Sequence, residues 1–222
     1  MKGGGRAIIA GLVLSAVGLT YIASDEGYRD TAYNDGGGVQ TNGFGTTTHA
    51  DGTPVKRGEK TDPVRALIAL QAHASKDEDA MRQCIGDVPL YQHEWDAYVR
   101  LAYNIGIGKS GVVDGFCYAK RGGYSGLVTA LHQNPPDYAG ACTEIKRWNK
   151  DNGRVIPGLV ARREREYRQC VGATTAPSPQ PSPTSGEGAL TPSPTRADGA
   201  IAPSPFMGEG WDGGVEDKGA SS

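Results

Sequence analysis

Several kinds of functional site find no support in this sequence of 222 residues. Its four cysteines include no Cys-x-x-Cys pair and its four histidines show no metal-ligand spacing, which argues against a zinc site or a thioredoxin-type motif. Lysine and arginine, 23 in all against 25 aspartate and glutamate, form no strong basic stripe, so we expect no nucleic-acid partner. No metal ion or organic cofactor is implied by the residues present.

A strongly apolar membrane span is also missing, although the chain begins with a weak candidate. Residues 7–24 carry no charge and follow Lys2 and Arg6. Their length just meets the ~18–20 residues that a helix needs to cross the bilayer core, but glycine, serine and threonine interrupt the apolar side chains. The two preceding basic residues favour a cytoplasmic N-terminus, so the rest of the chain would face the periplasm.

Three interpretations of residues 7–24 are open. A cleaved signal peptide would need a good cleavage position, but the best one, Ile22-Ala23-Ser24, is poor and would leave Glu26 at the extreme terminus. A permanent anchor that contains glycine and serine would be marginal. The third interpretation, which we favour, is an anchor weak enough to leave the bilayer later. The protein would then be tethered to the inner membrane first and periplasmic afterwards.

Composition divides the rest of the chain in two. Residues 25–172 can build a sizeable core, and an even number of cysteines in an exported domain favours two disulfides. The cysteines are Cys84, Cys117, Cys142 and Cys170. They allow three pairings, and four buried thiols are the alternative. Residues 173–222 repeat Pro-Ser-Pro units and hold few large apolar side chains, so we expect a disordered tail.

The hydrophobic period predicts mostly helices after residue 60. A start at Asp62-Pro63 favours a first helix that runs to Ile85. Further helices are expected at residues 91–105, 127–132, 138–148 and 159–170. Before them, a glycine-rich turn from Asn34 is followed by short stretches that suit the strands of a hairpin.

The residues after the apolar segment hold an acid, a second carboxylate and a hydroxyl around this turn. Eight residues lie between Glu26 and Asp35, and five lie between Asp35 and Thr41. Cleaving an acetal with water requires a proton for the leaving oxygen and support for a cationic sugar ring. We expect Glu26, at the edge of a packed core, to keep its proton, Asp35 in a solvated turn to stay ionised, and Thr41 to hold the water.

Taken alone, these three residues also fit a helix end, an Asx turn and a strand threonine. Three segments together, however, resemble the phage-type lysozymes, glycoside hydrolase family 24. They are Glu26, Asp35 and Thr41 followed by Gly43-Phe44-Gly45; Tyr103-Asn104-Ile105-Gly106-Ile107-Gly108; and GLVARRERE from Gly158 to Glu166. Their order and distances fit over about residues 25–171. The match is nearest to the lambdoid-phage endolysins that begin with a signal-anchor-release segment.

The resemblance implies an α+β, lysozyme-like fold: a small β-hairpin lobe, a larger all-helical lobe and an active-site cleft between them. It also implies a muramidase that hydrolyses the β-1,4 bond between N-acetylmuramic acid and N-acetylglucosamine in peptidoglycan and so lyses the host cell. We expect a monomer. Besides the three catalytic residues, the implied substrate-binding residues are Gly43, Phe44, Gly45, Asn104, Gly106 and Gly108. The chain departs from the family at Thr46, where many members have histidine.

Other functions fit parts of the pattern. A wall-binding protein without turnover would keep the cleft, and a membrane-lesion protein would need only residues 7–24. A lytic transglycosylase needs the acid but no bound water, so Asp35 and Thr41 argue against it.

Overall fold

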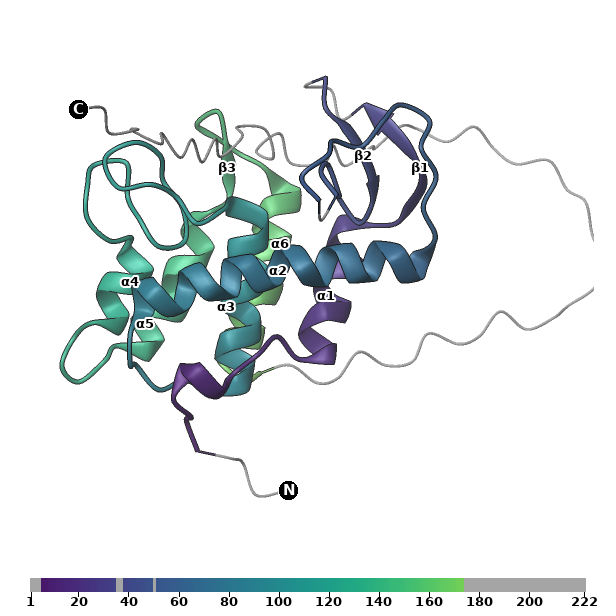
Figure 1. Cartoon of the computed structure of the whole chain (residues 1–222). Coiled ribbons are helices and arrows are strands. Elements are labelled where there is room, and N and C mark those ends of the chain that lie inside the picture. The colour runs from purple at the N-terminus through teal and green to yellow at the C-terminus, as the bar shows by residue number, and fades with distance from the viewer. Residues whose placement is uncertain (1–4, 35–37, 50, 174–222) are drawn as a thin grey trace, which may run out of the picture.

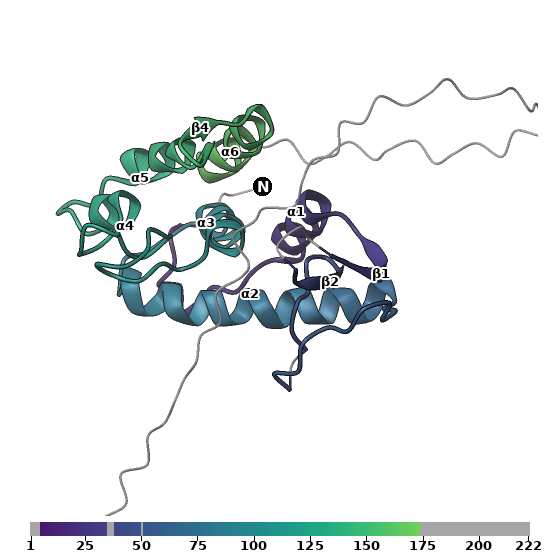
Figure 2. The same ribbon diagram turned by 90° about the horizontal axis from the view of Figure 1, so that it is seen from above.

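A long helix, α2 (Pro63–Ile85), runs along the molecule and carries a strand region at its first end and further helices toward its other end (Figures 1 and 2). The computed structural model describes residues 5–34, 38–49 and 51–173. Asp35 and the tail from residue 174 lie outside the described residues. The predicted start of α2 is confirmed, because the Asp62 carboxylate accepts hydrogen bonds from the Val64 and Arg65 amides, each 3.0 Å long.

The hairpin lobe (residues 28–62) is built on two antiparallel strands, β1 (Arg29–Asn34) and β2 (Gln40–Gly43). Tyr33 lies opposite Thr41 in their register. The Gly38 amide donates to the Asn34 side chain, 3.1 Å away, at the start of the turn between the strands. The predicted hairpin is therefore confirmed, with β2 carrying the catalytic threonine candidate.

The helical lobe comprises α1 and residues 63–172. After α2 its elements are α3 (Gln92–Ile105), α4 (Gly126–Leu131), α5 (Tyr138–Glu144), the 3-10 helix η2 (Ile145–Arg147) and α6 (Pro157–Cys170). The predicted helices are confirmed to within a few residues at their ends. A short hairpin of β3 (Lys150–Asp151) and β4 (Arg154–Val155) is not predicted. Its two-residue turn places Asn152 and Gly153 at positive φ, which suits a tight hairpin.

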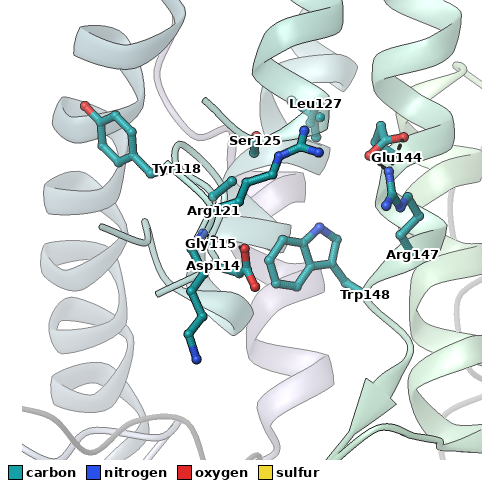
Figure 3. Close-up of a pocket in the computed structure, with 12 residues that line it drawn as sticks. Asp114, Gly115, Tyr118, Arg121, Ser125, Leu127, Glu144, Arg147 and Trp148 are labelled. Atoms are coloured by element: carbon teal, nitrogen blue, oxygen red, sulfur yellow. Dashed lines mark hydrogen bonds and ion pairs between the residues drawn. The ribbon is translucent and has the colours of Figure 1, made fainter. Parts of the chain in front are cut away.

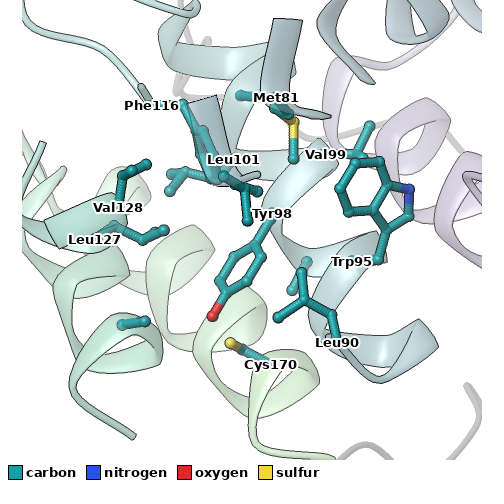
Figure 4. Close-up of a cluster of buried hydrophobic side chains, with 14 of the residues drawn as sticks. Met81, Leu90, Trp95, Tyr98, Val99, Leu101, Phe116, Leu127, Val128 and Cys170 are labelled. Carbon is teal, nitrogen blue, oxygen red and sulfur yellow. The ribbon is translucent and has the colours of Figure 1, made fainter. Parts of the chain in front are cut away.

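Helix α3 lies at the centre of the hydrophobic core. Trp95, Tyr98, Val99 and Leu101 are fully buried on it. The side chains packed around them come from α2, α4, α6 and the loop before α4 (Figure 4). This core fixes α3 and α2, and those two helices provide the surface on which the start of the chain lies.

Two disulfides join separate segments of the helical lobe to one another. Cys84 at the end of α2 is bonded to Cys117, and Cys142 in α5 is bonded to Cys170 at the end of α6. The expectation of two disulfides is confirmed, and the structure selects one of the three possible pairings.

The first residues of the chain do not form one continuous helix. A 3-10 helix, η1 (Ile9–Gly11), is followed by an extended stretch and then by α1 (Ala16–Glu26), so the expected boundary after Ser24 falls inside α1. Ile9, Leu12 and Ile22 are buried in the core of the helical lobe. Within the described parts of the chain, no helix combines the length and apolar character required to cross a membrane.

Candidate active site

Glu26 is the last residue of α1, and its carboxylate lies between the two lobes. Its Oε1 atom accepts a hydrogen bond from Nη2 of Arg162 on α6, at 2.8 Å. The two side chains are only 17% and 11% exposed. We expected an apolar surrounding for Glu26, but the structure gives it a partly buried ion pair, which fixes the direction of the carboxylate.

The neighbouring residue, Asp25, fastens the end of α1 to α3 and α6. Its buried carboxylate accepts hydrogen bonds from Nε of Arg100 at 2.6 Å and from Nη2 of Arg165 at 3.1 Å, and Arg162 lies 3.5 Å away. Burial by itself would raise the pKa of Asp25, but the hydrogen bond and charge of Arg100, together with Arg162 and Arg165, outweigh burial and hold that pKa below its usual value. The ionised form of Asp25 therefore stabilises this end of α1.

The loop after β2 faces the Glu26 carboxylate. A Cβ atom built on Gly45 would lie 3.8 Å from Oε2 of Glu26 and 3.9 Å from the Tyr103 hydroxyl. That hydroxyl donates to the Phe44 carbonyl at 3.1 Å, and burial raises the pKa of Tyr103. Tyr103 therefore holds the end of the hairpin against the helical lobe beside Glu26. Oε2 points toward this loop, while Oε1 is occupied by Arg162.

Thr41 lies in β2 and is buried, with 5% of its surface exposed. Among the described residues its hydroxyl has no hydrogen-bond partner. A buried hydroxyl of this kind can bind a water molecule or a ligand. Asp35 follows the last residue of β1 and lies outside the described residues, so its role stays a prediction.

The predicted substrate-binding residues of α3 and the following loop have structural contacts of their own. The Asn104 side-chain oxygen accepts a hydrogen bond from Arg163 on α6. Gly106 ends α3, and its carbonyl accepts from the Phe116 amide at 2.9 Å. Gly108 lies so close to Gly115 that an added Cβ would come within 2.6 Å of the Gly115 nitrogen. These contacts shape the end of α3 and the loop that follows it.

Sequence reasoning missed three residues at this site: Arg162, Tyr103 and Asp25. Arg162 was part of the third family-like segment, but nothing in that segment assigned it to Glu26. The sequence does indicate a different partner for Arg162: Glu166 follows it by four residues, and residues four apart face the same side of a helix. In the structure Arg162 does bind Glu166, at 3.2 Å.

A hollow of about 630 Å³ lies in the helical lobe between the loop before α4 and the segment around η2. Figure 3 shows Asp114, Arg121 and Trp148 around it, with Glu144 and Arg147 paired on one side. None of the residues that line it belongs to the Glu26 group. The hollow is therefore a separate feature from the candidate active site.

Comparison with known proteins identifies the family. The chain matches the Phage lysozyme family over residues 23–166, which is more than half of its length. The chain belongs to the phage lysozyme family. The matched range begins within α1 and ends in α6, so it includes Glu26, Thr41 and Arg162.

Individual relatives support this assignment. The endolysin of Salmonella phage P22 is 29% identical over 153 residues, covering 69% of this chain and 94% of the relative. The SAR-endolysin of Haemophilus phage HP1 is 27% identical over 161 residues, covering 72% and 81%. The solved endolysin from Escherichia coli O157:H7 phage FAHEc1 has a TM-score of 0.60 at 29% identity, covering 77% of this chain and 98% of that one.

These matches confirm the lysozyme-like α+β fold and the predicted activity. The protein is a muramidase of the endolysin type, a glycoside hydrolase that cleaves the β-1,4 bond between N-acetylmuramic acid and N-acetylglucosamine. Its substrate is peptidoglycan.

Proposed function

We propose that Glu26 is the general acid of this lysozyme and that it acts on the glycosidic oxygen through Oε2. The supporting observation is the unequal surrounding of the two oxygens: Oε1 binds Arg162, whereas Oε2 faces the loop at Gly45. Arg162 then acts as a positioning residue, because it aims the carboxyl group without occupying the oxygen that protonates the leaving group. Proton donation of this kind accelerates bond cleavage about 10²–10⁴-fold.

Thr41 and Asp35 complete the proposed chemistry on the opposite side of the sugar ring. The Thr41 hydroxyl, buried and without a partner among the described residues, is suited to hold the attacking water. Asp35 would assist that water or stabilise the cationic ring. A separation of ~6.5–9.5 Å between the Glu26 and Asp35 carboxyl groups would make the reaction inverting.

We further propose that the end of β2 with the loop after it, and the end of α3 with the loop after it, line the two sides of the cleft. The residues are Gly43, Phe44 and Gly45 on the hairpin side, and Asn104, Gly106 and Gly108 on the helical side. In this proposal residues 25–172 form the catalytic domain and act as a monomer. The expected tail, residues 173–222, stays a prediction, because residues 174–222 lie outside the described residues.

The direct test is wall clearing in a gel that contains purified peptidoglycan. Glu26→Gln keeps the shape of the side chain and removes its proton, so activity should fall at least about a hundredfold. Asp30→Asn is the matched control, because it changes an exposed carboxylate of β1, four residues along the chain, and should retain activity. Equal clearing by Glu26→Gln and wild type would eliminate Glu26 as the acid.

The location of the enzyme before lysis is a second proposal. We infer that residues 7–24 first lie in the inner membrane and that the enzyme acts in the periplasm after they leave it. In the packed form Ile8, Val13 and Val17 are still 63%, 64% and 57% exposed, as suits residues that once faced lipid. The name of the HP1 relative, a SAR-endolysin, agrees with this proposal.

A test of the membrane step should raise apolarity without disturbing the packed form. Gly11, Ala16 and Thr20 are exposed, so leucine at all three positions leaves the buried contacts of α1 intact. This variant should stay in the membrane fraction and fail to lyse cells, while wild type moves to the soluble fraction. Lysis by the triple variant at the wild-type rate would contradict the membrane step. The same substitutions to serine are the control.

A further inference from the structure

The residues just before α1 are neither helix nor strand, and yet side chains of α2 and α3 satisfy their backbone groups. Two carbonyls receive hydrogen bonds: Leu12 from Nη2 of Arg82 at 2.7 Å, and Val13 from Nε2 of Gln92 at 2.8 Å. The Leu14 amide donates a hydrogen bond to Oε1 of Glu78 at 2.6 Å. The stretch is thus held by side chains rather than by its own secondary structure.

Asp96 on α3 accepts two hydrogen bonds from Ser15, the last residue of this stretch. Its Oδ1 accepts from the Ser15 amide at 2.9 Å, and its Oδ2 accepts from the Ser15 hydroxyl at 2.6 Å. The same hydroxyl accepts from the Gly18 amide and so caps α1. Gln92 donates a third hydrogen bond to Asp96. The carboxylate is therefore buried and held on several sides, and α1 begins directly upon it.

Gly18 makes this close packing possible. A Cβ atom at this position would lie 2.9 Å from both Cγ and Oδ1 of Asp96 and 2.6 Å from a methyl group of Leu14. Asp96 cannot turn aside without losing its hydrogen bonds to Ser15 and Gln92. Gly11, by contrast, has no atom within 4 Å of such a Cβ. The two glycines therefore differ in what an added methyl group would meet.

Helix α1 is thus fastened at both ends. Asp96 holds its start, and Arg100 and Arg162 hold its last two residues, Asp25 and Glu26. An α-helix of 11 residues is a stiff rod, so a displacement of its start also displaces its end. The position of the catalytic carboxyl group therefore depends on contacts made at the far end of the helix.

We infer that Glu78 and Asp96 form a docking site for residues 12–18 and that, through α1, they act as positioning residues for Glu26. Gly18 allows α1 to pack closely on this docking site, because a larger residue would clash with Asp96. The inference rests on the proposed role of Glu26. Within a bilayer, residues 12–15 would need helical hydrogen bonds, because lipid offers no partners to the backbone. The two carboxylates supply partners that exist only in the packed form, and so favour it.

The test compares Gly18→Ala with Gly11→Ala in the purified full-length chain. Each adds one methyl group to the same segment and changes its apolarity equally. With soluble glycan fragments, Gly18→Ala should lower kcat about tenfold and leave KM within about twofold. Gly11→Ala should leave both constants within about twofold. Hydrogen exchange should rise across Ala16–Glu26 in Gly18→Ala but stay unchanged in α6.

Two further variants separate positioning from loss of stability. Asp96→Asn keeps the side-chain shape and should lower kcat in the same way, with little added effect when Ser15→Ala is combined with it. Val128→Ala, in the remote helix α4, should lower the melting temperature and keep kcat. Either of two results would overturn the inference: Gly18→Ala behaving like Gly11→Ala, or Gly18→Ala losing no more activity than Val128→Ala at the same melting temperature. Full activity of Glu26→Gln would instead reject the proposed function.

Discussion

The two lobes of this lysozyme are built in different ways. The helical lobe has a continuous core around α3 and two disulfides, whereas the hairpin lobe has two short strands, a glycine-rich loop and few buried apolar side chains, among them Val55. Glu26 belongs to the first lobe through α1, and Thr41 belongs to the second. In the proposed mechanism the helical lobe therefore supplies a rigid support and the acid, and the hairpin lobe supplies the hydroxyl that holds the water.

The largest expected effect concerns the core. Leu101→Ala should lower the free energy of unfolding by about 2–5 kcal/mol, because it leaves a cavity in the centre of α3 packing. Val55→Ala, at a buried position of the hairpin lobe, should lower it by only about 1.5 kcal/mol. Urea unfolding of both variants measures the contrast. Equal losses of unfolding free energy in the two variants would show that the two lobes rely equally on buried apolar side chains for stability.

The second effect concerns Asp77, on the face of α2 beside Tyr103. Burial and then the charge of Glu78 raise the pKa of Asp77 to about 7, and burial also lowers the pKa of His73, whose Nε2 lies 3.7 Å from Asp77. A raised acid pKa stabilises the fold at low pH, and this contribution, about 4 kcal/mol, is lost as pH rises from about 4 through about 7.

Asp77→Asn should remove that pH dependence and make the protein more stable than wild type above pH of about 7. Urea unfolding at several pH values measures it. Asp87→Asn, at an exposed position after α2, is the matched control and should leave the pH dependence unchanged. A wild-type stability that stays flat across this pH range would contradict the prediction.

The third effect concerns the disulfide between α5 and α6. Replacing both Cys142 and Cys170 by serine should lower the free energy of unfolding by about 3.6 kcal/mol, as expected for a closed loop of 28 residues. Because α6 carries Arg162, activity at temperatures well below the melting transition should change little. A large fall in kcat at those temperatures would show that the disulfide positions Arg162 directly.

The smallest expected effect concerns the Thr41 hydroxyl and is measured as a change in kcat. Thr41→Val keeps the size of the side chain but removes the hydroxyl, so kcat should fall about tenfold to a hundredfold, or about 1.4–2.8 kcal/mol. Thr41→Ser retains a hydroxyl and should keep most of the activity. If the valine and serine variants are equally active, the hydroxyl does not hold the water.

The sequence was sufficient for the features that depend on local patterns. Asp62-Pro63 predicts the start of α2 and the glycine-rich turn predicts the hairpin, and the structure confirms both. The catalytic roles of Glu26, Asp35 and Thr41, inferred from their spacing, stay predictions. The sequence does not predict how residues 7–24 pack. An apolar run indicates that the segment avoids water, but not whether lipid or protein covers it. Arg162 and Asp96 were missed as partners for a related reason: their contacts join residues far apart in the chain.

The central claim is that Glu26 protonates the glycosidic oxygen while a water attacks the sugar. Digesting purified peptidoglycan in water labelled with heavy oxygen, followed by mass analysis of the fragments, tests it most directly. We predict one heavy oxygen at each new reducing N-acetylmuramic acid end with wild type, and almost no fragments with Glu26→Gln. Unlabelled anhydro ends, or the same labelled fragments at the same rate from Glu26→Gln, would contradict the account.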